Sequence, residues 1–137
     1  MNRVYPEFSV RQSPLGAGFA GPITWRLQPV DPTAFFDPFN TVLGDLGPVL
    51  VGAGDTIPLD AVSNDGTAAR YETSGTVTLI DVTSADDVGA FVVVADDGVD
   101  EVLVAWIDTR ADSSPVAFVG TGAPVPVEFP LAWFLRV

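Results

Sequence analysis

The clearest pattern of hydrophobic and polar positions lies in the second half of the chain. Two runs of mostly β-branched and apolar residues, 91–95 and 101–107, flank the segment Asp96-Asp97-Gly98. Asp-Gly between two such runs predicts a β-hairpin, because Gly98 can adopt a positive φ without steric cost. Neither run alternates apolar with polar residues, so both faces of the hairpin are expected to be covered. The second sheet of a sandwich, or a subunit interface, would supply that cover.

Shorter apolar and β-branched runs bounded by turn residues continue this pattern from residue 41 onward. They lie at 49–51, 56–62, 76–83, 116–119, 125–129 and 131–137. Short strands with turns between them are typical of antiparallel sandwiches and barrels. We therefore predict an all-β fold, an antiparallel β-sandwich or barrel whose body spans residues 41–137.

The first part of the chain breaks this pattern and carries most of the prolines. Seven of the twelve prolines lie within residues 1–48. Proline fixes φ and lacks an N–H donor, so neither a long helix nor a central strand is expected there. We predict an extended Pro/Gly-rich N-terminal arm over residues 1–40, with an edge strand at 23–28. Asp31, followed by proline, has the sequence of a cap on a single helical turn.

This arm is too rich in aromatic side chains to be a disordered tail. The large aromatic residues are Tyr5, Phe8, Phe19, Trp25, Phe35, Phe36 and Phe39. We expect them to occupy pockets, either on the protein's own body or on a partner, and we take them as candidate partner-binding residues.

Charge is distributed unevenly along the chain, which has a formal net charge of −12. Residues 1–30 hold three arginines against one glutamate, whereas residues 31–137 hold seventeen carboxylates against three arginines. An acidic body repels the phosphate backbone, so we expect no nucleic-acid partner. The acidic body is either a solvated face or the surface on which the slightly basic arm docks, in its own chain or in a neighbouring copy.

The missing residue types exclude much chemistry. The chain has no cysteine, no histidine and no lysine, since all six basic residues are arginine. Serine–histidine and cysteine–histidine nucleophiles, Schiff-base lysines and thiolate or imidazole metal sites are therefore excluded. The two Gly-x-Gly segments, at 52–54 and 120–122, lack the third glycine of a dinucleotide motif, and we interpret them as turns. We expect no enzymatic activity and no cofactor.

The acidic segments at 86–87 and 96–101 are the remaining candidates for metal binding. Their oxygen ligands suit Ca²⁺, but the spacing at 96–101 does not match an EF-hand loop, and a solvated hairpin tip explains it better. We expect no metal site. Paired carboxylates can hydrolyse glycosides, yet nothing in the sequence brings two of them into one cleft. The longest uncharged stretches, 12–25 and 113–127, are interrupted by proline and glycine, so no membrane span is expected.

A proline-rich, aromatic-bearing arm followed by a small all-β body without catalytic side chains resembles the accessory structural proteins of tailed-phage virions, capsid decoration (cement) proteins above all. The features that carry the resemblance are residues 1–48 and the apolar strands at 91–95 and 102–107. Proteins of this class are β-rich and oligomeric, and they hold capsid subunits with extended termini. The resemblance implies a virion localisation and, as partners, other copies of this chain and a larger assembly such as a capsid.

The predicted function is that of a non-enzymatic virion structural protein, a capsid decoration protein that stabilises an assembly through its arm and its apolar strand faces. A head–tail connector or tail component is the alternative within this class. A secreted carbohydrate-binding or adhesion module is the alternative from a different class, with Trp25, Trp106 or Trp133 as a platform for the sugar.

Overall fold

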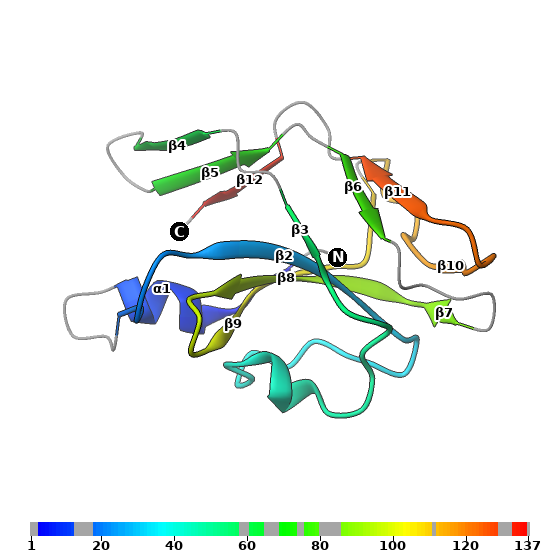
Figure 1. Cartoon of the computed structure of the whole chain (residues 1–137), viewed down its shortest axis with the longest axis horizontal. Coiled ribbons are helices and arrows are strands. Elements are labelled where there is room, and N and C mark those ends of the chain that lie inside the picture. Colours follow the sequence, from blue (N-terminus) through cyan, green and yellow to red (C-terminus); the bar gives the residue numbers. More distant parts are fainter. Residues whose placement is uncertain are drawn as a thin grey trace.

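The computed structural model describes residues 3–12, 18–57, 61–64, 69–73, 76–79, 86–110, 112–128 and 133–136. Its largest unit is an antiparallel sheet of five strands in the order β1-β9-β8-β2-β3 (Figure 1). These strands are β1 (Arg3–Val4), β2 (Thr24–Val30), β3 (Asp55–Thr56), β8 (Ala90–Asp96) and β9 (Glu101–Ile107).

The smaller sheets are also antiparallel, and the helices are short. β10 (Phe118–Val119) pairs with β7 (Asp87–Val88), β11 (Val125–Glu128) pairs with β6 (Thr76–Leu79), and β12 (Trp133–Arg136), β5 (Ala69–Thr73) and β4 (Ala61–Asn64) form a sheet in that order. The helices are α1 (Pro6–Gln12) and the 3-10 helix η1 (Leu43–Leu46). The predicted all-β, antiparallel class is confirmed, and the finer form of sandwich or barrel stays a prediction.

The predicted hairpin is confirmed as β8 and β9, and it contains a β-bulge. Val93 pairs with Ala105 but Val94 pairs with Leu103, so Val104 is the additional residue of β9. Because side chains alternate between the faces of a strand, Leu103 and Trp106 would otherwise point to opposite faces. The bulge places them both in the same apolar cluster, while Val104 and Ala105 contribute to the other.

Both faces of this hairpin are covered by the protein itself, as the lack of alternation predicted. Phe91, Val93 and Ala95 belong to one buried cluster, which Phe118, Val125 and Val127 also contact. Ala90, Val92 and Val94 belong to a second cluster on the opposite face. In Figure 1 the smaller sheets lie on one side of the five-stranded sheet, and the loop between β2 and β3 lies on the other. Side chains of that loop, among them Phe36, Leu43, Leu46 and Val49, cover the second cluster.

The described part of residues 1–40 does not form an extended arm, and the domain boundary at residue 40 falls inside the loop that covers the sheet. β1 pairs with β9, and the Tyr5 amide donates to the Val104 carbonyl at 2.9 Å. α1 begins at Pro6, which stands in the first helical position, where a missing N–H leaves no intrahelical bond unmade. Proline density therefore excluded a long helix but allowed a short helix between Pro6 and Pro14.

The edge position expected for residues 23–28 is also wrong, because β2 is an inner strand. It pairs with β8 along its whole length and with β3 at Arg26 and Leu27. Pro29 is tolerated because its carbonyl accepts from the Val51 amide at 3.0 Å. The N–H and C=O of one strand residue point to the same side, so the absent donor faces the irregular segment around Val51, and the ladder with β8 stays intact.

The N-terminal segment should therefore be necessary for the stability of the fold. Phe8 in α1 is fully buried in the first cluster, with its ring centroid 5.4 Å from that of Trp25. We expect Phe8→Ala to lower the free energy of unfolding by about 3–5 kcal/mol in a urea titration. Phe39→Ala, which truncates the same side chain at a position that is 89% exposed, should change it by less than about 0.5 kcal/mol. Equal effects of the two substitutions would contradict this role of the N-terminal segment.

Candidate interaction surface

The loop between β2 and β3 is held in a fixed shape by three aspartates that bind its own backbone. Asp31 Oδ1 accepts from the Thr33 amide at 2.8 Å and from the Thr33 hydroxyl. Asp37 Oδ1 accepts from the Phe39 amide at 2.9 Å. Asp45 Oδ2 accepts from the Thr41 amide at 2.8 Å and from the Val42 amide at 3.1 Å. Each aspartate closes a local turn, so the side chains between these turns are presented in a defined arrangement.

Two phenylalanines on this loop are exposed to solvent. Phe35 is 72% exposed and Phe39 is 89% exposed, although Phe36 between them packs against the second core cluster. Single exposed apolar residues are ordinary, but two large exposed aromatic rings within five residues of one ordered loop make this loop a candidate for contact with a partner. We name Phe35, Phe39 and the loop residues between them the aromatic loop.

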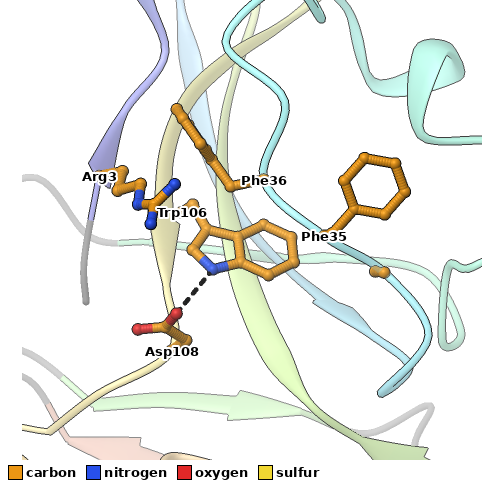
Figure 2. A pocket seen from close by; sticks show the side chains of 6 residues that line it. Arg3, Phe35, Phe36, Trp106 and Asp108 are labelled. Atoms are coloured by element: carbon orange, nitrogen blue, oxygen red, sulfur yellow. Dashed lines mark hydrogen bonds between the residues drawn. The ribbon is translucent and has the colours of Figure 1, made fainter.

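A first hollow of about 310 Å³ lies beside Phe35 (Figure 2). It is lined by Arg3, Ala34, Phe35, Phe36, Trp106 and Asp108. The Arg3 guanidinium carbon lies 5.2 Å from the centre of the Phe36 ring, which is a cation–π contact. The Trp106 indole N–H donates to Asp108 Oδ2 at 3.1 Å, as the dashed line in Figure 2 marks. In that view the indole lies between Arg3 and Phe35, with Asp108 on the same side as Arg3, so the charged groups lie at one end of the hollow and Phe35 lies at the other.

A second hollow, of about 160 Å³, shares part of its lining with the first. Ala34 and Phe35 line both hollows, so Phe35 forms the ridge between them. The other lining residues are Thr33, Asp37, Asn40, Asp45, Leu46 and Val49. The second hollow therefore combines an apolar floor with two carboxylates and two neutral polar groups.

The structure separates the seven aromatic residues that the sequence indicated as candidates. Tyr5, Phe8 and Trp25 are buried in the protein's own core, and Phe19 and Phe36 are partly buried against it. Phe35 and Phe39 alone among the seven are largely exposed, and both lie on the aromatic loop. Sequence reasoning named Trp106 only as a sugar platform and did not find Arg3, Asp108, Asp37 or Asp45. An Asp two residues before Thr33 and another two before Phe39 are nevertheless recognisable signals of local turns.

The sugar platform expected from exposed tryptophans is absent at the two positions where side chains are described. Trp25 and Trp106 are 8% and 5% exposed, because both belong to strands of the five-stranded sheet whose two faces are covered. The side chain of Trp133 lies outside the described part of the structure. A buried indole cannot stack on a sugar ring. Two of the three tryptophans proposed for the carbohydrate-binding alternative are therefore unsuitable.

The carboxylates of the acidic hairpin tip form hydrogen bonds and ion pairs with other groups of the protein. The Asp97 carboxylate accepts from the amides of Ala20 at 2.8 Å, Val99 at 3.0 Å and Asp100 at 2.7 Å. These amides, that of Ala20 first, lower the pKa of Asp97 to about 2. Within the described residues, no group of three or more carboxylates is placed so that it could hold a metal ion.

Comparisons of the chain with models of protein families, with curated proteins and with solved structures found no match. In the part of the chain that the structure describes, no helix has the length and apolar character needed to cross a membrane. The interpretation of this surface therefore depends on the geometry of the chain itself.

Asp97 should make the stability of the protein sensitive to acid. Its folded pKa of about 2 lies below the ordinary value of 3.8, so its contribution is present above about pH 4 and is lost as the pH falls toward 2. Asp97→Asn should be less stable than the native protein at pH 6 and should lose less stability between pH 5 and pH 2.5. Urea titrations across this range measure both effects. If the stability of Asp97→Asn depended on pH in the same way as that of the native protein, Asp97 would not stabilise the hairpin tip.

The Tyr5 hydroxyl is a buried polar group next to the aromatic loop, and its effect on stability can be tested by substitution. The side chain is fully buried, its hydroxyl has no hydrogen-bond partner among the described residues, and its ring centroid lies 4.8 Å from that of Phe36. Burial, and then the charge of Asp37, raises its pKa to about 12. We expect Tyr5→Phe to leave the free energy of unfolding at pH 7 unchanged or to raise it by up to about 1 kcal/mol.

The same variant should respond less to alkali. Because the folded pKa of Tyr5 exceeds the ordinary value of 10, the native protein should lose stability as the pH rises from about 10 toward 12. Tyr5→Phe should lack this component of the loss in chemical denaturation at each pH. If Tyr5→Phe were less stable than the native protein at pH 7 by about 1 kcal/mol or more, the Tyr5 hydroxyl would have to form a stabilising hydrogen bond, contrary to this prediction.

Proposed function

We propose that this protein is a non-enzymatic structural protein that docks on a neighbouring protein subunit through the aromatic loop, and that it acts in a virion as a capsid decoration protein. The observation that carries the docking is the exposure of Phe35 and Phe39 on an ordered loop. The virion and capsid parts of the proposal come from the resemblance in sequence organisation described above.

The fixed shape of the loop favours binding. A flexible segment that binds a partner must lose conformational freedom at that moment, which lowers the affinity. The turns closed by Asp31, Asp37 and Asp45 order the loop already in the free protein. Phe35 and Phe39 are thus presented with little entropy left to lose in the backbone.

The edges of the five-stranded sheet make association by strand addition unfavourable. Each edge strand, β1 and β3, has two residues. The remaining edge of β9 is covered at Leu103, whose amide donates to the Thr41 carbonyl at 2.9 Å, and at Val104 by Tyr5. The remaining edge of β2 binds the amides of Val51 and Ile57. Short, interrupted edges offer a partner strand few free backbone groups, so side chains must supply the contact.

The size of a stable interface indicates how much of the surface takes part. Two phenylalanines bury about 300–500 Å² together, whereas a specific interface needs about 1,000 Å² or more. The rims of both hollows adjoin Phe35 and extend the contact area. A decoration protein of this kind would stabilise an assembly by adding such area across a boundary between subunits.

The proposal is tested by sedimentation with virus particles purified from the system that encodes the chain. We expect the native protein in the particle fraction and Phe35→Ser/Phe39→Ser in the unbound fraction, with the amount on particles reduced by about tenfold or more. Val99→Ser is the matched control, because Val99 is also exposed, at 75%, but lies on the hairpin tip. Absence of the native protein from the particles would refute the virion role, and unchanged binding of the double variant would refute the docking surface.

A further inference from the structure

The carboxylates of this protein fall into two groups that differ in how their charge is balanced. At the hairpin tip, Arg26 pairs with Asp96 at 3.3 Å and with Glu101 at 2.6 Å. Arg11 pairs with Asp100 and with Glu7, both at 3.0 Å. Two of the six arginines are therefore committed to this end of the molecule, where each pairs with two carboxylates and compensates part of the negative charge.

The aromatic loop and its borders lack this compensation. Asp31, Asp37 and Asp45 accept hydrogen bonds from neutral groups of the loop, and none of them forms an ion pair with a described residue. The Thr33 hydroxyl lowers the pKa of Asp31, and the amides of Thr41 and Val42 lower that of Asp45. Among the residues that the structure describes, no arginine forms an ion pair with any of these three carboxylates.

The second hollow combines this charge with apolar surface. Asp37 and Asp45 lie at its lining together with Leu46 and Val49, and the exposed Phe35 forms its border. The hydrogen bonds engage Oδ1 of Asp37 and Oδ2 of Asp45, so the second oxygen of each carboxylate accepts no hydrogen bond from the described residues. An arginine or lysine side chain fits such a place, because its methylene groups cover apolar surface while its charged end meets carboxylates.

We propose that the partner surface that docks on the aromatic loop is basic and apolar, with an arginine or lysine entering the second hollow between Asp37 and Asp45 and an apolar residue contacting Phe35 and Phe39. This inference rests on the proposed function and specifies the chemistry of the partner. A second copy of the chain fits less well, because pairing this face with itself would bring uncompensated carboxylates together in a molecule of net charge −12. Nucleic acid is repelled for the same reason.

The test uses two short designed peptides as probes, identical in their leucines and differing in that one carries arginine where the other carries glutamate. Fluorescence anisotropy of the labelled peptides measures binding to the full native chain. We expect the arginine peptide to bind at least about tenfold more tightly than the glutamate peptide, and its affinity to fall as NaCl rises from about 50 mM to about 300 mM. Equal binding of both peptides, or no binding of either, would overturn the proposal.

Matched variants distinguish the second hollow from the general acidity of the protein. Asp37→Asn removes one charge but keeps an oxygen that can accept from the Phe39 amide. Asp112→Asn removes one charge at an equivalent turn elsewhere, where Asp112 Oδ1 accepts from the Ser114 amide at 2.9 Å. We expect Asp37→Asn to weaken the arginine peptide severalfold and Asp112→Asn to leave it unchanged. Equal weakening by both variants would show that only net charge matters and would overturn the proposal.

Light scattering and sedimentation separate the remaining outcomes. A dimer of the native chain that Phe35→Ser/Phe39→Ser abolishes would identify a second copy as the occupant and would overturn the basic partner. Sedimentation with particles without peptide binding would leave the docking function standing and would overturn the partner chemistry. Peptide binding to a chain that never sediments with particles would support the partner chemistry and would reject the virion role.

Discussion

The fold depends on one constraint, which is that both faces of the β8–β9 hairpin must be kept from water. Six consecutive residues of β8, from Ala90 to Ala95, are buried, and they divide between two apolar clusters. A strand that is apolar on both faces is stable only inside a layered arrangement. The β-bulge at Val104 serves the same constraint, because it turns the large side chains Leu103 and Trp106 to the face that the loop covers.

This constraint determines where the aromatic residues of the first forty positions are placed. Phe8 and Trp25 complete one cluster, and Tyr5 and Phe36 complete the other. Burial of a phenylalanine side chain contributes about 1.5–3 kcal/mol, so a chain of this size gains more from burying these rings than from leaving them available to partners. Phe35 and Phe39 are exceptions to this tendency, because both rings are largely exposed on the ordered loop.

The hairpin could be predicted from sequence because its signals are local. The two apolar runs and Gly98, whose φ is +89°, specify strands, turn and two-sided burial within a short segment. The helix α1 and the inner place of β2 in the sheet could not be predicted, although a strand was expected at 23–28, because proline excludes a conformation only where its missing N–H would be needed. Pro6 and Pro29 both stand where no bond is lost. The exposure of Phe35 and Phe39 was equally hidden, since it depends on the shape of a loop whose backbone binds Asp31 and Asp37.

One segment of the chain, the loop between β2 and β3, both covers the core and carries the candidate docking surface. A change in this segment can therefore affect both. Phe36 packs against the second cluster, while its neighbour Phe35 projects into solvent, so one stretch of backbone presents an inner and an outer surface. Phe36 and Leu43 pack against the sheet and hold the loop in place. The outer surface of the loop is therefore held in place as well. The outer rings touch little of the chain and can change without loss of stability, whereas the inner ones cannot. A binding surface built in this way can change its specificity while the fold beneath it is conserved by its own packing.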